Sequence, residues 1–315
     1  MQLGIGTAPG KVILFGEHAV VYGRPALAAP VVQVVARAIV EGRPAGSGLV
    51  IDALDLRRSI VLAEADHPLA LVTRLALDRL GLAEPDWRVS VRSTIPIASG
   101  LGSGAAVSAA VVRGLSQAAG VELGPAEVSA IVYEVERLHH GTPSGVDNTV
   151  IAYGQPVCFV RGTPPEPFAI ARPFTIAIGD TGKASPTKIA VGDVRAAWER
   201  DRARYEALFD RVACVVASAR AAITEGRPEE LGPLMDENQA LLREIGVSSP
   251  ELERLIAAAR AAGATGAKLS GGGRGGNMIA LVTPESAAAV ADALRAAGAV
   301  RVIVTEIGHA GGDDA

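Results

Sequence analysis

Short apolar segments alternate with polar, glycine-rich segments along the first half of the chain. Val12–Phe15 is a continuous apolar run, which is typical of a buried strand. Val31–Val40 is also mostly apolar, and Trp87–Ile95 alternates apolar and polar residues as a strand with one buried face does. Two helices are expected at Ala105–Gly120 and Gly124–Gly141, the second with an apolar stripe along one side.

Helical patterns dominate the second half. Helices are predicted at Val194–Glu225, Pro228–Ile245, Ser248–Gly263 and Thr283–Gly298. The last two open with Ser249 or Thr283 before a proline and stop at a glycine, the residue types that favour a helix start and a helix end. Strands are expected at Met278–Val282 and Val300–Ile307. Helices and strands in this succession predict a layered α+β fold.

A proline-dense stretch at Arg161–Phe174 lies between the two halves. Prolines and glycines at this density interrupt helices and strands, so we expect a domain junction there. The prediction is an N-terminal domain over residues 1–170 and a C-terminal domain over residues 171–315.

Composition excludes several classes of protein. Hydrophobic residues make up 49% of the chain and aromatic residues only 3%, so the core must be mostly aliphatic. The net charge of −4 shows no basic excess for binding a nucleic-acid backbone. No apolar run is long enough to cross a membrane and the N-terminus lacks a signal-peptide layout, so a soluble cytoplasmic protein is expected. Cys158 and Cys214 lack metal or redox spacing, and both are expected to be buried thiols.

Lysine is rare in this chain. Of 30 basic residues only four are lysines: Lys11, Lys183, Lys188 and Lys268. These four indicate places where a compact ammonium cannot be exchanged for a planar guanidinium, with chance survival as the alternative.

Glycine-rich loops are the first chemical signal. The segment GTAPGKV is not a P-loop, because its glycines are too close together and Val12 follows the lysine. GLGSG at Gly100–Gly104 is not a dinucleotide fingerprint, because it closes one residue early. It still joins a strand to a helix N-terminus, whose free N–H groups favour an anion, so we expect phosphate binding there. The alternative is a plain tight turn.

A third glycine-rich segment, KLSGGGRGGNM at Lys268–Met278, surrounds Arg274 with five glycines. Ordering five glycines costs backbone entropy, which a simple linker would not require. Close approach of a ligand or another chain segment is the expected reason, and a purely structural turn is the alternative.

Four segments together resemble the GHMP small-molecule kinases, in the order of that family: PGKVILFGEHAVVYG, PIASGLGSGAA, HGTPSGVDNTV and KLSGGGRGG. The individual residues within these motifs are similar to those of the mevalonate kinase branch of the family. This resemblance implies an N-terminal domain like the second domain of ribosomal protein S5 and a ferredoxin-like C-terminal domain. It also implies transfer of a phosphoryl group from ATP to the 5-hydroxyl of mevalonate, in the mevalonate pathway of isoprenoid biosynthesis.

The resemblance assigns roles by position. Asp147 matches the catalytic base, Lys11 the lysine beside it, and Glu136 the magnesium-binding glutamate, with Ser103 as a second candidate ligand of Mg²⁺. A carboxylate can take the proton of an alcohol as it attacks, and an ammonium nearby stabilises the negative charge. The ATP-binding loop would comprise Pro96, Ile97, Ala98, Ser99, Gly100, Leu101, Gly102, Ser103, Gly104 and Ala105. Without the resemblance, Asp147 is equally well explained as a turn residue. For Glu136 the alternative is a place on a solvated helix face.

Glu17 and His18 resemble substrate-contacting residues, and Ser144 and Thr187 are further candidates for substrate binding. A helix cap is the alternative for Glu17 and His18. The pattern departs from the family at Gly104, where a second serine commonly supplies a metal-ligating hydroxyl. Arg274, which interrupts the third glycine run, either offsets this loss by donating to the phosphates or points to solvent.

Other functions stay open at this point. One alternative is a kinase of the same family for another small alcohol, such as phosphomevalonate or a sugar. Another is a catalytically inactive metabolite sensor, which would be expected to lack the aspartate or the lysine. The expected partners are a small-molecule substrate with no nucleic acid and no membrane, and a homodimer is one of the possible oligomeric states.

Overall fold

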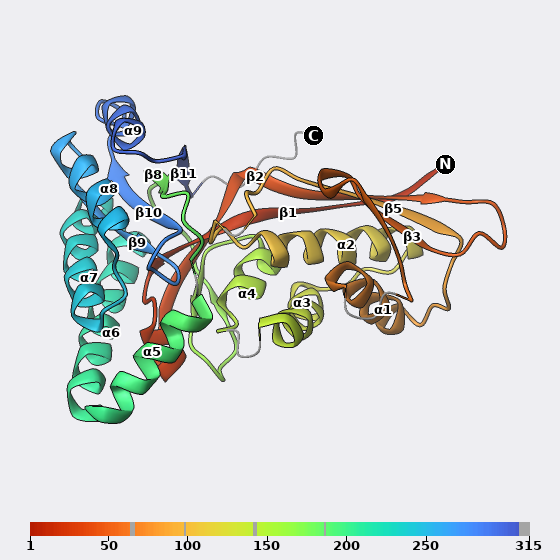
Figure 1. Cartoon of the computed structure of the whole chain (residues 1–315), viewed down its shortest axis with the longest axis horizontal. Helices are drawn as coiled ribbons and strands as arrows, with labels where there is room; N and C mark the ends of the chain where they lie inside the picture. Colours follow the sequence, from red (N-terminus) through yellow and green to blue (C-terminus); the bar gives the residue numbers. More distant parts are fainter. Residues whose placement is uncertain (64–66, 98, 141–143, 186, 309–315) are drawn as a thin grey trace. The chain divides into compact units, whose positions relative to one another are not determined.

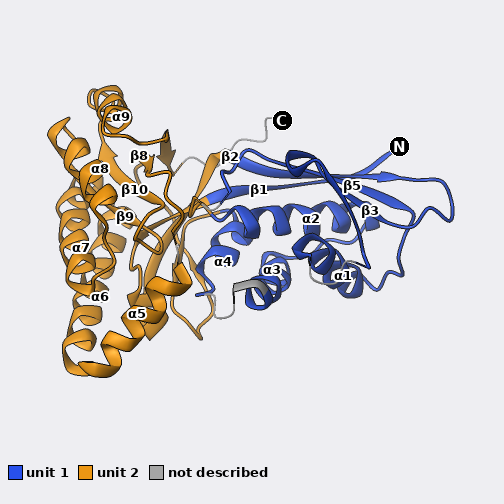
Figure 2. Cartoon of the chain, in the orientation of Figure 1, with its two compact units in different colours: residues 1–10, 34–97, 102–154 blue, residues 11–33, 98–101, 155–315 orange. Residues whose placement is uncertain are grey.

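The computed structural model describes residues 1–63, 67–97, 99–140, 144–185 and 187–308 of the 315-residue chain (Figure 1). The chain forms two compact units, coloured separately in Figure 2. Unit 1 comprises residues 1–10, 34–97 and 102–154, and unit 2 comprises residues 11–33, 98–101 and 155–315. The strands β1 (Gln2–Phe15) and β2 (Ala26–Gly42) contribute residues to both units. The domain boundary near residue 170 stays a prediction.

Unit 1 consists of a layer of strands and a layer of helices. Its strands lie in the order β4-β3-β5-β2, with β1 beside β2. The shorter strands are β3 (Val50–Ala53), β4 (Arg58–Val61) and β5 (Trp87–Ser93). The helices are α1 (Pro68–Leu80), α2 (Ser103–Ala119), α3 (Pro125–His140) and α4 (Val146–Tyr153). They pack on one another on one side of the strands (Figure 1).

Glycines let β1 approach α2 closely. A Cβ atom on Gly6 would lie 2.0 Å from the carbonyl oxygen of Ala110, and one on Gly4 would lie 2.4 Å from that of Gly114. No side chain fits at those distances, so backbone packs against backbone along this contact.

Unit 2 contains a four-stranded antiparallel sheet in the order β11-β8-β10-β9. Its strands are β8 (Phe174–Asp180), β9 (Gly266–Ser270), β10 (Asn277–Val282) and β11 (Arg301–Ile307). The helices are α5 (Thr187–Arg200), α6 (Arg202–Thr224), α7 (Leu231–Ile245), α8 (Pro250–Ala261) and α9 (Ala287–Ala296). Helices follow the first strand and separate the last two, which with this strand order is the ferredoxin-like βαββαβ arrangement. The α+β prediction is confirmed.

Three smaller features complete the description. In unit 2 the beginning of β2 pairs with β6 (Val157–Phe159), which in turn pairs with β7 (Glu166–Pro167). Single 3₁₀ turns occur at Ala19–Tyr22, Leu54–Leu56 and Pro228–Glu230. Within the described ranges, no helix combines the length and apolar character needed to cross a membrane.

Helix boundaries follow the capping chemistry. Helix α8 starts as predicted, with Ser249 Oγ accepting a hydrogen bond from the N–H of Leu252 at 3.4 Å. The single helix predicted over Val194–Glu225 is wrong: two helices meet there, because Asp201 caps α6 by accepting from the N–H of Arg204 at 3.3 Å. Helix α9 begins only after Ser286, later than expected from Thr283.

One of the two cysteine predictions is also wrong. Cys158 is buried in β6, but Cys214 is exposed. Helix α6 turns only one side toward the core, and Cys214 lies on its solvent-exposed side although its sequence neighbours are apolar.

Candidate active site

Lys11 lies in the final part of β1, where every residue through Phe15 is buried. Its backbone N–H donates a hydrogen bond to the carbonyl oxygen of Leu101 at 3.0 Å. The strand that carries the lysine is therefore joined directly to the glycine loop. The sequence marked both segments as unusual but contained no signal that they touch.

A second contact holds the start of the glycine loop. The carbonyl oxygen of Ser99 accepts a hydrogen bond from Asn277 Nδ2 at 2.6 Å, and both residues are buried. Gly100 follows with a φ of +85°, which favours glycine at this position. Asn277 was not predicted as a site residue, although a polar residue opening the apolar strand β10 was the available signal. Ala98, predicted as part of this loop, lies outside the described residues.

The other end of the loop leads into α2 within unit 1. Gly102 is the N-cap residue, with a φ of +74°, and has no side chain to accept from the first N–H groups of the helix. The Ser103 hydroxyl lies 3.5 Å from the carbonyl oxygen of Ile95, which is a long contact. A helix start without a side-chain cap has N–H groups available to an anion, and phosphate binding at this place stays a prediction.

Both acidic candidates of unit 1 lie on helices that pack against α2. Glu136 is half-buried on α3, and a Cβ atom on Gly104 would lie 3.3 Å from its Oε1. Asp147 is half-buried in the first turn of α4. The carboxylate of Glu136 is thus beside the start of α2, where the phosphates are expected.

In unit 2, Glu17 and His18 form a tight turn after β1. Gly16 has a φ of +98° and His18 a φ of +61°, which is uncommon for a residue other than glycine. The Glu17 carboxylate forms an ion pair with Lys268, and both side chains are fully buried. His18 Nε2 lies 3.1 Å from the carbonyl oxygen of Gly272. Both residues are therefore anchored to the third glycine-rich segment.

The protonation state of His18 follows from this contact. Burial lowers the pKa of His18 to about 4, and the positive charge of Arg274 acts in the same direction. The ring is therefore neutral near pH 7. A carbonyl oxygen can only accept, so Nε2 carries the proton and Nδ1 is a hydrogen-bond acceptor.

The remaining substrate candidates lie in separate places. Thr187 is the exposed first residue of α5, and its Oγ1 would be only 2.5 Å from a Cβ atom on Gly272. Ser185 donates from Oγ to the carbonyl oxygen of Gly273 at 2.9 Å. These residues share the neighbourhood of His18 in unit 2. Ser144 belongs to unit 1, where its hydroxyl accepts from the N–H of Val146 at 3.3 Å at the start of α4.

Arg274 has a protein partner. Its backbone has a φ of +56°, and its N–H donates to the carbonyl oxygen of Val247 at 2.8 Å. Its guanidinium forms an ion pair with Asp193 on α5. The sequence offered phosphate or solvent as alternatives for this side chain and did not anticipate the carboxylate.

Known proteins similar to this chain identify its family. Models of the N-terminal and C-terminal domains of GHMP kinases match residues 69–155 and 219–300. The chain is 37% identical to the mevalonate kinase of Pyrococcus horikoshii, over 95% of this chain and 94% of that protein. It is 36% identical to the mevalonate kinase of Pyrococcus furiosus, over 98% and 97%. The structure of L. major mevalonate kinase in complex with R-mevalonate matches with a TM-score of 0.85 and 30% identity, over 96% and 95%.

The chain therefore belongs to the GHMP kinase family. As a member of a kinase family it uses ATP as the phosphoryl donor. Within the family, the relatives named above are all mevalonate kinases.

Proposed function

We propose that this chain is a mevalonate kinase, which transfers the γ-phosphoryl group of ATP to the 5-hydroxyl of mevalonate in the cytoplasm. The observation that carries this proposal is the similarity to mevalonate kinases over nearly the whole chain, at 37% identity to the Pyrococcus horikoshii protein. A solved relative at 30% identity was crystallised with R-mevalonate. The retention of Lys11 and Asp147 favours an active kinase over a metabolite sensor.

In this proposal Asp147 is the general base. Its carboxylate takes the proton of the 5-hydroxyl as that oxygen attacks the γ-phosphorus, and the bond from the γ-phosphorus to the bridging oxygen breaks to release ADP. Lys11 stabilises the negative charge that develops on the attacking oxygen. The pairing of the two side chains around the substrate is part of the proposal.

The loop from Pro96 to Ala105 is proposed to hold the phosphates of ATP. Two kinds of contact support this. Asn277 donates to the carbonyl oxygen of Ser99, and the backbone of Lys11 donates to that of Leu101. Where the loop enters α2, the first N–H groups of the helix have no side-chain cap. A loop held in this way needs little reorganisation when the nucleotide binds.

The residues present fit one magnesium ion held mainly by phosphates and water. Among the described residues no group of three or more His, Cys, Asp or Glu could hold a metal by itself. Mg²⁺ in phosphoryl-transfer sites commonly takes only one or two carboxylates from the protein. Glu136 would supply the carboxylate and Ser103 is the second candidate, and the ion would neutralise phosphate charge. The position of Glu136 beside Gly104, at the start of α2, supports this assignment.

The alcohol site is proposed to comprise Glu17, His18, Ser144 and Thr187. Mevalonate carries a carboxylate and two hydroxyls, so its site needs both donors and acceptors. The hydroxyls of Ser144 and Thr187 can do either, while the neutral ring of His18 presents Nδ1 as an acceptor.

An ADP-release assay with mevalonate, phosphomevalonate and galactose tests the substrate. We expect turnover with mevalonate and at least 100-fold lower kcat/KM with the other two. A clear preference for either of those would refute the assignment and favour the alternative of another small-alcohol kinase.

The base is tested by Asp147→Asn. We expect kcat to fall by about 10²–10⁴-fold with ATP binding retained, because the variant loses the proton acceptor but no nucleotide contact. Asp210→Asn, which removes an exposed partner of Arg24, is the control and should leave kcat unchanged. Turnover by Asp147→Asn at the wild-type rate would show that another group is the base.

A further inference from the structure

Lys268 is the most deeply buried charged residue of unit 2 that the proposed mechanism does not use. Its side chain is 0% exposed, and its Nζ forms an ion pair with the carboxylate of Glu17, 251 residues away in the sequence. The same ammonium donates to the carbonyl oxygen of Leu269 at 2.6 Å and lies 6.0 Å from the ring of Phe15. Lys268 is also one of the four lysines in this arginine-rich chain.

Burying this ion pair opposes folding in part. Two charges lose their hydration, and a well-packed apolar pair of similar size is often no less stable. Burial raises the pKa of Glu17 and lowers the pKa of Lys268, and in each case the opposite charge of the partner only counteracts this effect. Glu17 Oε2 is buried and has no hydrogen-bond partner among the described residues. Stability alone is therefore a weak reason for this pair.

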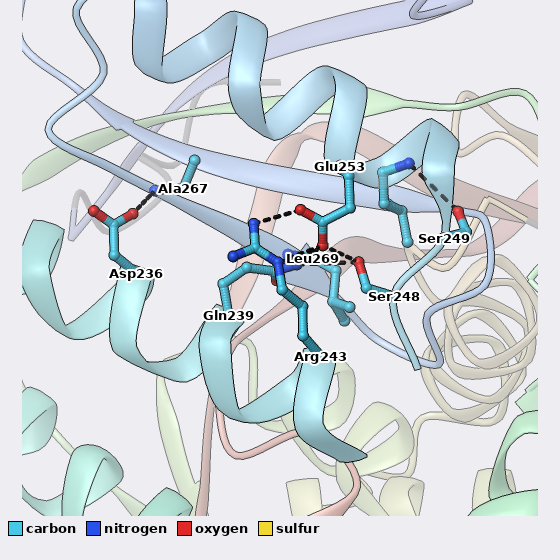
Figure 3. A network of polar contacts seen from close by, with 9 residues as sticks. Asp236, Gln239, Arg243, Ser248, Ser249, Glu253, Ala267 and Leu269 are labelled. Carbon is cyan, nitrogen blue, oxygen red and sulfur yellow. Dashed lines mark hydrogen bonds and ion pairs between the residues drawn. The ribbon is translucent and has the colours of Figure 1, made fainter. Parts of the chain in front are cut away.

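The strand that carries Lys268 is held firmly on its other edge. β9 is an edge strand of its sheet, and on its free edge side chains of α7 accept the backbone hydrogen bonds that a neighbouring strand would otherwise accept (Figure 3). Asp236 Oδ1 accepts from the N–H of Ala267 at 3.0 Å, and Gln239 Oε1 accepts from the N–H of Leu269 at 2.9 Å. Gln239 is itself fixed, since its Nε2 donates to Glu253 at 2.8 Å. The backbone on both sides of Lys268 is thus held in a fixed position against α7.

The turn that Lys268 reaches is strained at His18. His18 has a φ of +61° and a ψ of −48°, and it is the centre of a γ-turn closed by the N–H of Ala19, which donates to the carbonyl oxygen of Glu17 at 2.7 Å. Such backbone strain costs about 1–3 kcal/mol and persists only where the surroundings enforce it.

Within the turn, the N–H of Val20 donates to the carbonyl oxygen of Gly16 at 3.2 Å, and the N–H of Val21 donates to that of His18 at 3.0 Å. The side chains of the turn are held from outside it, Glu17 by Lys268 and His18 Nε2 by the carbonyl oxygen of Gly272. Both of these partners belong to the stretch that begins in β9, so the two side chains are held from the same direction.

We propose that Lys268 is a positioning residue for the alcohol substrate. Its ammonium holds the Glu17 carboxylate, and through it fixes the turn that presents Nδ1 of His18 to a substrate hydroxyl. A guanidinium cannot replace it, because a planar, larger group does not fit a fully buried site that also contacts Leu269. This inference rests on the proposed kinase function, and it makes Glu17 a positioning residue that acts through His18.

Steady-state kinetics of Lys268→Met test the inference. The change keeps the length of the side chain and removes the charge. We expect KM for mevalonate to rise by about 10- to 100-fold, the loss typical of a binding group displaced by about 1 Å, with KM for ATP within about twofold of wild type. Lys268→Arg should show a similar rise. Lys183→Met replaces an exposed lysine of the same unit and should leave both KM values unchanged.

The double variant Glu17→Gln/Lys268→Met separates positioning from stability. It leaves no unpaired buried charge, so it should fold even if Lys268→Met does not, but it cannot restore the ion pair. We expect its KM for mevalonate to stay raised. A wild-type KM for mevalonate in any folded variant, or equal rises in both KM values, would overturn the inference.

A spectroscopic measurement keeps this test independent of the kinase assignment. The chain has five histidines, so ¹⁵N spectra of the imidazole rings can resolve His18. In the wild type we expect a neutral ring with the proton on Nε2 between pH 5 and 8, and in the variants a ring that titrates in this range. If wild type fails to phosphorylate mevalonate, the proposed function falls, and these spectra still decide the role of Lys268. An unchanged His18 signal in the variants would refute it.

Discussion

Asn277 offers a direct test of how the glycine loop is held. Its Nδ2 donates to the carbonyl oxygen of Ser99 at 2.6 Å inside the protein, and its side chain is 2% exposed. Asn277→Leu keeps nearly the same size and removes the donor. Asn277→Asp keeps the shape but, when ionised, turns a carboxylate oxygen toward the carbonyl oxygen of Ser99.

The expected magnitude follows from the hydrogen bond that the carbonyl oxygen of Ser99 loses. A buried acceptor that loses its partner costs about 1–3 kcal/mol. The loop can avoid this cost by turning the carbonyl to solvent, and ATP binding must then restore the original conformation. At about 1.4 kcal/mol per factor of ten, KM for ATP should rise about 5- to 150-fold in Asn277→Leu. We expect a larger rise in Asn277→Asp, because two acceptors then repel each other.

The assay compares KM for ATP with KM for mevalonate, alongside nucleotide binding by calorimetry. Only the ATP values should change. The matched control is Asn238→Leu on α7: this asparagine is fully buried too, but neither of its side-chain polar atoms has a hydrogen-bond partner among the described residues. That control should be as stable as wild type or more so, with unchanged kinetics. If Asn277→Leu binds ATP with wild-type affinity, the loop is not held by this bond.

Three further predictions concern other contacts. Lys268→Met should lose stability as pH rises from 5 to 8, by about 3–5 kcal/mol at the upper end, because the pKa of Glu17 is already raised by burial and rises further without the ammonium. The protonated carboxyl is tolerated at low pH, so thermal melts of this variant should improve on acidification, whereas those of Glu17→Gln/Lys268→Met should not. Gly104→Ser should lower the magnesium concentration for half-maximal activity about 3- to 10-fold, because its Cβ would lie 3.3 Å from Glu136 Oε1 and a small shift of that carboxylate lets a hydroxyl at this position reach the same ion. An unchanged magnesium titration would contradict that role of Glu136. Gly266→Ala should cost about 3 kcal/mol or more in chemical denaturation, because its Cβ would lie 2.1 Å from the carbonyl oxygen of Gly232. Gly192→Ala on the exposed side of α5 has open space and should instead add up to about 1 kcal/mol.

Local signals predicted the regular elements best. Helix α8 starts at the serine and proline that the sequence indicated, because a cap is made by residues within one turn of each other. The period-two pattern at Trp87–Ile95 corresponds to β5. The wrong prediction at Val194–Glu225 has the same origin, since Asp201 is an N-cap residue type inside a segment whose composition predicts one continuous helix.

The glycine-rich segments were also recognisable in the sequence, because so many glycines are costly to order without a function. The residues that contact these segments were not recognisable. Asn277 is 178 residues from Ser99, and Lys268 is 251 residues from Glu17. Nothing in the residues around Lys268 shows that a carboxylate lies against it. Its rarity among arginines indicated only that the ammonium has a specific environment.

By itself, then, the sequence determined where many of the helices and strands lie, which loops contain too many glycines for simple linkers, and which family the motifs resemble. Tertiary structure decided which of these segments touch: α7 against β9, Asn277 against the glycine loop, and Lys268 against the turn of Glu17 and His18. The physical reason is range. Caps and periodicity depend on neighbours within a few residues, whereas a buried charge or carbonyl finds its partner only when distant parts of the chain exclude water together.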